Sequence, residues 1–235
     1  MSAAQILAEL KPLAKDSYKK ILLKHGIPEP VLGVSIEQLK KIQKRIKKDY
    51  QLALDLYDTG IYDAMYLAGL IADDAKMTKK DLQRWVDQAT NSGVCSYTVP
   101  WVAASGSHGR ELALKWIESK KPHVATAGWA TLVSLVGITP DDHLDMVELK
   151  ALLKRVEKTI HNEPNDVRYM MNNFVIALGT YVKPLGDLAL KAAEKIGEVS
   201  VDFGDTCCQV PHAPDYIRKV RARGSVGKKR KSAKC

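Results

Sequence analysis

From about residue 36 onward, apolar residues recur three and four positions apart, a spacing that predicts amphipathic helices. Leu39, Ile42 and Ile46 form one such stripe. The nearly continuous apolar run from Met65 to Ile71 predicts a helix that is buried on most of its surface. Glycine and proline interrupt the pattern often, which predicts helices joined by short loops. The interruptions fall at Gly60, Gly93, Gly106, Pro122, Gly137, Pro140, Pro164, Pro184 and Gly197.

Composition also favours helices over strands. Aromatic residues make up only 6% of the chain, while small and straight-chain residues that suit helices are plentiful. Paired helices stacked side by side are the architecture of HEAT-like repeats, so we predict an all-α fold, an α-solenoid of stacked HEAT-like helical repeats. We assign residues 1–204 to this repeat domain and residues 205–235 to a basic C-terminal extension. Segment 196–205 alternates apolar and polar residues and is either one short strand or an extended arm.

The excess positive charge is concentrated near the C-terminal end. Residues 218–235 hold nine Lys or Arg and no Asp or Glu, and nine is also the formal net charge of the whole chain. The remaining residues are balanced, with 27 basic and 27 acidic side chains. A positive block attracts polyanions, nucleic acid first, through counterion release, although such tails also serve as solubilising segments or import signals. The densest part contains Lys228, Lys229, Arg230 and Lys231.

A second basic stretch lies on a predicted helix at residues 40–48, where six of nine residues are Lys or Arg. The three-and-four spacing predicts that Lys40, Lys44, Lys47 and Lys48 share one face, while the two isoleucines of this stretch turn toward the core. Like charges at this spacing repel one another by a few tenths of a kcal/mol per pair. A polyanion partner would explain why they are tolerated, and the alternative is a solvated helix face.

Segment 91–101 consists of small polar residues that lead into a new helix. Ser96 and Thr98 are candidates to cap that helix and to present backbone N–H groups to a phosphate. Tyr97 and Trp101 are candidates to stack on a base or a sugar. For Trp101, packing in the core is the alternative.

Two amides, Asn172 and Asn173, interrupt an otherwise apolar helix over residues 166–176. Buried amides need hydrogen-bond partners, so these side chains either bond across to a neighbouring helix or face a groove. The structural role is favoured. Arg168 adds a positive charge to the same helix and is a candidate phosphate contact.

Other kinds of site find little support in the sequence. No zinc-protease, phosphate-loop or dinucleotide motif occurs, and the acidic cluster at residues 141–145 is typical of a helix start. Cys95 has no histidine near it in the sequence to activate it as a nucleophile. We therefore predict no metal, no cofactor and no catalytic residue. Without a signal-peptide pattern or a membrane-length apolar run, we expect an intracellular protein that contacts no membrane, is cytoplasmic and nucleoid-associated in a prokaryote, and is a monomer by default.

Five segments, taken in order, resemble the DNA alkylation repair family, which is built of HEAT-like repeats and whose active members are alkylpurine DNA glycosylases. The likeness extends over nearly the whole chain and is greatest to a divergent branch with a similar Lys-Arg-Lys and Cys ending. It implies an α-solenoid that holds duplex DNA against its concave face. The segments are 25–34 (HGIPEPVLGV), 62–69 (YDAMYLAG), 93–101 (GVCSYTVPW), 172–174 (NNF) and 224–235 (GSVGKKRKSAKC).

The chain departs from the active members where their chemistry lies. The resemblance implies two tryptophans and an aspartate in the active branch, and Val94, Thr98 and Ile176 stand at the matching positions. The aspartate is thought to stabilise the cationic sugar that forms as an alkylated purine leaves, and threonine carries no negative charge. A shifted alignment does not supply the carboxylate, because no Asp or Glu lies between Asp87 and Glu111. The resemblance therefore implies weak or lost glycosylase activity.

The preferred interpretation is a DNA-binding protein that recognises duplex, branched or distorted DNA by charge and shape through a basic concave surface. One alternative is an active alkylpurine DNA glycosylase, so the sequence leaves open whether the chain is an enzyme. The other is a scaffold that binds an acidic protein on its concave face. The candidate DNA-binding residues are Lys40, Lys44, Lys47, Lys48, Tyr97, Thr98, Trp101, Arg168, Asn172, Asn173, Lys228, Lys229, Arg230 and Lys231.

Overall fold

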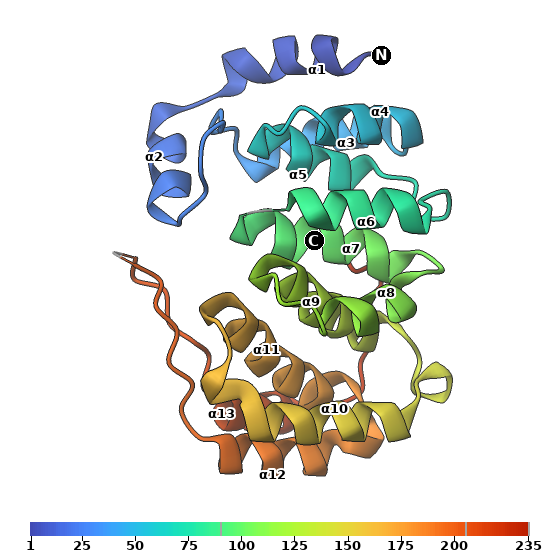
Figure 1. Ribbon diagram of the computed structural model, residues 1–235, viewed down its shortest axis with the longest axis vertical. Coiled ribbons are helices and arrows are strands. Elements are labelled where there is room, and N and C mark those ends of the chain that lie inside the picture. The colour runs from blue at the N-terminus through green and yellow to red at the C-terminus, as the bar shows by residue number, and fades with distance from the viewer. Residues whose placement is uncertain (90, 205, 235) are drawn as a thin grey trace.

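The computed structural model describes residues 1–89, 91–204 and 206–234 of the chain. These residues form α-helices linked by short turns, and the described ranges contain no β-strand. Figure 1 shows the helices stacked from α1 (Ala3–Leu10) at one end to α12 (Gly186–Ile196) at the other. The all-α fold and the α-solenoid expected from the helix rhythm are confirmed.

The other helices follow the predicted rhythm. Their bounds are α2 (Asp16–Lys24), α3 (Ile36–Ile46), α4 (Tyr50–Tyr57), α5 (Tyr62–Ile71), α6 (Lys79–Gln88), α7 (Val99–Ser105), α8 (Gly109–Trp116), α9 (Pro122–Ile138), α10 (Met146–Thr159), α11 (Asn165–Tyr181) and α13 (Ala213–Ala222). A π-helical turn, Val94–Thr98, leads directly into α7. Side chains cap several starts: Ser35 accepts a hydrogen bond from an N–H of α3, and Asp145 does the same for α10.

From α4 onward the helices form two layers. The inner layer consists of α5, α7, α9 and α11, and every residue of α5 from Asp63 to Ile71 is buried. The outer layer consists of α4, α6, α8, α10 and α12, each of which keeps exposed residues on one side. Helix α9 packs against α7, α8 and α11 and so links neighbouring repeats. The continuous apolar run of α5 is therefore that of an inner helix, as predicted.

Large aromatic side chains fill the core between the layers. Tyr57 and Trp85 stack with ring centroids 4.1 Å apart, and Trp129 meets Phe174 edge-on at 5.3 Å. Each of these four residues is at most 1% exposed. Because burying one large apolar side chain stabilises a fold by about 1.5–3 kcal/mol, such pairs hold successive repeats at a fixed spacing.

A buried carboxylate fixes the loop that precedes α3. Asp63 is fully buried on α5 and accepts hydrogen bonds from the backbone N–H groups of Leu32 at 2.6 Å and Val34 at 2.7 Å. The N–H of Gly33 lies 3.2 Å from the same carboxylate. A buried charge is tolerated where hydrogen bonds replace its hydration. This contact joins two of the segments that carry the family resemblance, and it sets the position of α3.

Between α12 and α13 the chain forms an extended arm, which Figure 1 shows as two segments rising beside the stack. Phe203 anchors the arm by meeting Tyr169 of α11 edge-on, with ring centroids 5.5 Å apart. The described part of segment 196–205 beyond α12 contains no strand, so of the two expectations the extended arm holds. Asp205 lies outside the described residues.

Helix α13 was not anticipated from the sequence, and it packs against α11 and α12. Ile217 on α13 is fully buried against Gly179 of α11, where an added Cβ would lie 2.5 Å from the Ile217 side chain. After α13, residues 224–234 run without helix back along the stack. The described part of the C-terminal extension is thus packed against the repeats, and the boundary after residue 204 stays a prediction. Cys235 lies outside the described residues.

Candidate nucleic-acid interface

The inner helices line two adjoining cavities. The first has a volume of about 400 Å³ and lies between α5, α7, α9, α11 and the C-terminal segment. The second has a volume of about 660 Å³ and lies where α2 and the arm approach the starts of α5 and α11. The cavities share wall residues, and we call the two together the inner channel. The shared residues are Tyr62, Ser96, Tyr97 and Met170.

A row of four aromatic side chains lines the first cavity. Ring centroids are 6.2 Å apart for Tyr62 and Tyr66, and 5.4 Å apart for Tyr66 and Trp101. Tyr97 lies 5.8 Å from Trp101. Trp101 is only 6% exposed and Tyr97 is 44% exposed. Trp101 therefore belongs to the core with one edge on the cavity, while Tyr97 is the ring that a ligand reaches most easily.

The three candidates on α11 have different surroundings. Asn172 is 2% exposed, and its side-chain amide donates a hydrogen bond to the carbonyl of Pro211 at 2.9 Å, so it has the structural role favoured from the sequence. Asn173 lines the first cavity. Arg168 is partly buried and is not among the wall residues of either cavity. Of these three side chains, Asn173 is the one that reaches the inner channel.

Thr98 is fully buried in the π-helical turn. Its methyl group packs on Gly69 of α5, where an added Cβ would lie 2.6 Å from it. Among the described residues its hydroxyl has no hydrogen-bond partner, so the expected helix cap is wrong. Val94 is also fully buried and Ile176 is 7% exposed. Burial raises the pKa of the neighbouring Cys95 thiol to about 12, which keeps it protonated and unreactive.

Helix α3 ends earlier than the sequence suggested. It stops at Ile46, and Lys47 follows with a φ of 66°, which turns the backbone out of the helical path. Lys47 and Lys48 therefore lie beyond the helix, and the expectation that four lysines share one helical face is wrong. The inward placement of the isoleucines is confirmed, because Ile42 is buried and Ile46 packs against the core.

The lysines of this stretch differ in their neighbours. Lys44 and Lys47 are exposed and, in the part of the chain that the structure describes, form no ion pair with a carboxylate. Lys40 is partly buried. Lys48 lies 3.8 Å from a carboxylate oxygen of Asp74. Lys44 and Lys47 are therefore the cations of this stretch that are most available to a polyanion.

The C-terminal segment is docked along the ends of the inner helices, and we call residues 226–234 the strap. The N–H of Gly227 donates to the carbonyl of Thr180 at 2.8 Å, near the end of α11. The N–H of Arg230 donates to the carbonyl of Gly137 at 2.8 Å, near the end of α9. The last carbonyls of a helix lack partners within it, and the helix dipole makes that end negative. Because packed helices lie about 8–10 Å apart and an extended chain advances about 3.3 Å per residue, roughly three strap residues cross one helix.

Two cations of the strap turn toward the protein. The Lys229 ammonium lies 2.8 Å from Asp141, and the guanidinium of Arg230 lies over the Tyr181 ring at 5.7 Å from its centroid. The tail is therefore no free polycationic arm along its described length, and two of its four central candidates are engaged within the protein. The exposed candidates of this run are Lys228 and Lys231.

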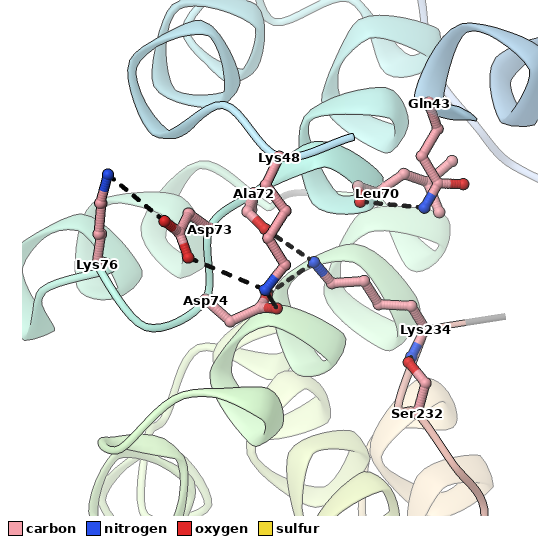
Figure 2. Close-up of polar contacts among 9 residues, drawn as sticks. All are labelled: Gln43, Lys48, Leu70, Ala72, Asp73, Asp74, Lys76, Ser232 and Lys234. Carbon is pink, nitrogen blue, oxygen red and sulfur yellow. Dashed lines mark hydrogen bonds and ion pairs between the residues drawn. The ribbon is translucent and has the colours of Figure 1, made fainter. Parts of the chain in front are cut away.

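Figure 2 shows the contacts at the end of the strap. The Lys234 ammonium lies 2.8 Å from Asp74 and donates a hydrogen bond to the carbonyl of Ala72 at 3.0 Å. The two charged side chains are 11% and 10% exposed. Burial lowers the pKa of Lys234, and the nearby Asp74 carboxylate partly offsets this effect. Because Lys48 approaches the same carboxylate, the two basic segments singled out in the sequence meet at Asp74.

Three residues of this region were not anticipated from the sequence. Tyr62 and Tyr66 are four positions apart on α5, and this spacing was a usable signal that both rings face the same way. Asp74 follows directly after the apolar run of α5 as one of two adjacent aspartates. No local pattern pairs it with a lysine 160 positions later.

The described ranges show neither a metal site nor a membrane-spanning helix. Asp166 and Asp202 line the second cavity, and Cys208 of the arm lies 3.9 Å from His25 there. Even so, no group of three or more His, Cys, Asp or Glu among the described residues could hold a metal ion. None of the helices in those ranges is long and apolar enough to cross a bilayer.

Comparisons with known proteins point to one family. Residues 6–196 match the family described as DNA alkylation repair enzyme. An uncharacterized protein of Listeria innocua is 32% identical over 224 residues, which are 93% of this chain and 97% of the relative. An uncharacterized protein of Listeria monocytogenes is 31% identical over 224 residues, again 93% of this chain and 97% of the relative. A solved structure described as belonging to a new family of proteins related to the HEAT-like repeat DNA glycosylases, with affinity for branched DNA structures, has a TM-score of 0.92 and 34% identity over 100% of both chains.

Proposed function

The chain belongs to the DNA alkylation repair family, and we propose that it binds branched or distorted duplex DNA without excising alkylated bases. The observation that carries this proposal is the likeness over the full length of both chains to a protein described as having affinity for branched DNA. At 34% identity and a TM-score of 0.92, the two chains share one fold over their whole length. The proposed ligand surface is the inner channel together with the exposed cations of α3 and of the C-terminal strap.

The missing carboxylate supports the second half of the proposal. Cleavage of a glycosidic bond is aided by a negative charge placed where positive charge develops on the sugar. Thr98 stands at the aspartate position of the active branch, is buried, and carries no charge. No Asp or Glu occurs between Asp87 and Glu111, so the segment has no carboxylate of its own to offer.

Exposed cations supply the expected attraction to phosphates. Lys44 and Lys47 lie at the end of α3, and Lys228 and Lys231 lie on the strap. The Lys48 and Lys234 side chains meet at Asp74, so the end of the basic stretch after α3 lies beside the end of the strap. Such contacts position DNA without reading its sequence, and each displaces condensed counterions. Binding should therefore weaken steeply as salt is raised.

The test compares DNAs of one length and different shape. Purified protein is titrated with a linear duplex, a gapped duplex and a four-armed junction at two salt concentrations, and binding is followed by fluorescence anisotropy. We expect tighter binding to the junction than to the duplex at both concentrations. Equal affinity for all three DNAs, or no dependence on salt, would contradict the proposal.

A base-release assay tests the loss of glycosylase activity. Methylated DNA is incubated with the protein, and free methylpurine is separated by chromatography and quantified. We expect no release above that of DNA alone. Release that disappears when the inner channel is altered, as in Tyr97→Ala, would show an active site and overturn this part of the proposal.

A further inference from the structure

The strap forms part of the wall of the first cavity, alongside the inner helices. Arg230 and Ala233 line this cavity together with the aromatic row, and its volume of about 400 Å³ is typical of a small-ligand pocket. Ala233 is 1% exposed and belongs to the core of the N-terminal half, although it stands near the other end of the chain. The pocket therefore has its full shape only when the strap is docked.

The pocket walls carry the groups that bind an unpaired nucleobase. Proteins hold single-stranded nucleic acid by stacking bases on aromatic rings beside positive charge. Here the rings of Tyr97 and Trp101 lie at the wall, and Ser134 and Asn173 supply hydroxyl and amide groups for the edge of a base. An apolar ligand would leave those polar groups without a partner, whereas a base can stack on the rings and also form hydrogen bonds with the hydroxyl and amide groups.

Arg230 brings a positive charge to this pocket. It packs so closely on Gly137 that an added Cβ there would lie 2.8 Å from the guanidinium. Two of its nitrogens, Nε and Nη2, are buried against Gly137 and have no hydrogen-bond partner among the described residues, where the guanidinium also forms no ion pair. The charge is thus held in place by packing and by the Tyr181 ring, and no carboxylate neutralises it. A phosphate next to a bound base would do so.

We infer that the docked strap completes a pocket that accepts one unpaired nucleobase at the branch point of a bound DNA, with Tyr97 stacking on the base and Arg230 facing the adjoining phosphate. This inference rests on the proposed function, because it presumes that branched DNA enters the inner channel. A base inside a duplex is stacked on both sides and cannot enter the pocket. Unpaired bases at a branch point are free to enter, so the pocket gives a preference for branched DNA that charge alone does not.

The test removes only the base. Two branched DNAs are compared, one with a single unpaired nucleotide at the branch point and one with an abasic sugar phosphate at the same position. Wild-type protein should bind the DNA that has the base at least about fivefold more tightly, which is the lower limit of what stacking one base on an aromatic ring contributes. Equal affinity for the two DNAs, with binding intact, overturns the inference but leaves the proposed function standing. No preference for either branched DNA over linear duplex overturns both.

Variants assign the effect to the pocket. Tyr97→Ala should bring the affinity ratio of the two DNAs close to one. Arg230→Gln should weaken binding to both branched DNAs, because both keep the phosphate that the guanidinium faces, and should leave binding to linear duplex nearly constant. Tyr216→Ala is the matched control for the tyrosine, since Tyr216 is 48% exposed on α13 and lines neither cavity. Lys231→Gln is the control for the arginine and should weaken binding to branched and linear DNA by the same factor. An unchanged base-to-abasic ratio in Tyr97→Ala, or an Arg230→Gln variant that loses branched and linear DNA equally, would contradict the assignment. Circular dichroism confirms that each variant is folded.

Lys234 tests the contribution of the strap in the full-length protein. Lys234→Ala removes the ion pair that holds the end of the strap to Asp74, without touching the pocket wall itself. Because Lys234 only positions the strap, the variant should have a lower affinity ratio of the two DNAs, while its binding to the abasic DNA stays nearly constant. A loss of affinity that is equal for both DNAs would show that the strap does not shape the pocket.

Discussion

The two basic segments of this chain look alike in sequence and differ in what their charges do. Lys44 and Lys47, at the end of α3, are exposed and form no ion pair among the described residues. On the strap, Lys229 is paired with Asp141 and Lys234 with Asp74. A run of like charges is thus available to a partner only where the fold places no carboxylates or carbonyls against it.

Helix ends explain the difference. The strap crosses the C-terminal ends of α11 and α9 and finishes beside Ala72, directly after α5. Each of these ends presents carbonyls without intrahelical partners and a negative dipole end. Lys44 and Lys47 lie at the C-terminal end of their own helix, and their side chains extend into solvent. The same residue type therefore acts as an internal clasp in one segment and as a solvent-facing cation in the other.

Removing the strap should lower the stability of the protein more than any of the changes below. A chain ending at Gly224 loses three or more hydrogen bonds to helix ends, each worth about 1 kcal/mol. We expect the free energy of unfolding to fall by about 3 kcal/mol, which lowers Tm by roughly 6–12 °C in a chain of this size. Thermal melts followed by circular dichroism measure the change. A truncated chain that melts with the full-length protein would show that the strap is not a structural element.

Lys234→Ala should have the next largest effect. It leaves Asp74 about one-tenth exposed and without its closest cation, and unpairing a largely buried charge is strongly destabilising. Because Lys48 stays within reach of the same carboxylate, we expect a loss of about 2 kcal/mol in urea unfolding, below the usual range for a sealed pair. Lys231→Ala is the matched control on the exposed side of the strap and should change stability by less than about 0.5 kcal/mol. Equal losses of stability in the two variants would show that Lys234 stabilises the fold no more than an exposed lysine of the strap.

The double change Lys44→Gln and Lys47→Gln should alter DNA binding and leave stability nearly unchanged. Stability should stay within about 0.5 kcal/mol of the wild type, while the slope of log affinity for DNA against log salt becomes shallower by about 2. Lys41→Gln is the control, since Lys41 already pairs with Glu37 at 2.8 Å on the same helix. A slope that is unchanged in the double variant would show that the end of α3 does not contact phosphates.

The pH dependence of stability should show the smallest effect. Burial holds the pKa of Lys234 below its usual value in the folded protein, so in the pH range between that lowered value and about 10.5 the unfolded chain binds more protons. Stability therefore rises with pH across this range. We expect the free energy of unfolding of the wild type, measured in urea, to rise relative to that of Lys234→Met as pH increases from 8 to 10.5. A constant difference between the two proteins would contradict a lowered pKa.

The sequence predicted what depends on local pattern. The apolar run of α5 identified an inner helix, the isoleucines of α3 pointed inward as expected, and Asn172 has the structural hydrogen bond that a buried amide requires. The boundary of α3 was misjudged, because the positive φ of Lys47 is a tertiary outcome that lysine does not favour by itself.

Contacts between distant segments were beyond the reach of pattern. Nothing local in the basic tail indicates that it will bind helix ends, since those carbonyls lie 47 to 162 residues earlier in the chain. The burial of Thr98 depends on the close approach of Gly69 from another helix. The pocket arises in the same way, from rings on α5 and α7 and a guanidinium on the strap.

The docked strap also has a consequence for the order in which the molecule assembles. Translation completes every helix end that the strap binds before the strap itself exists, so repeats that fold during synthesis do so with these carbonyls facing water. The final step is then the closing of a long loop, whose entropic cost grows only slowly with its length. The earlier repeats thus wait in a nearly finished form, and the arrival of Lys234 at Asp74 marks the moment when the first and last parts of the chain become one cooperative unit.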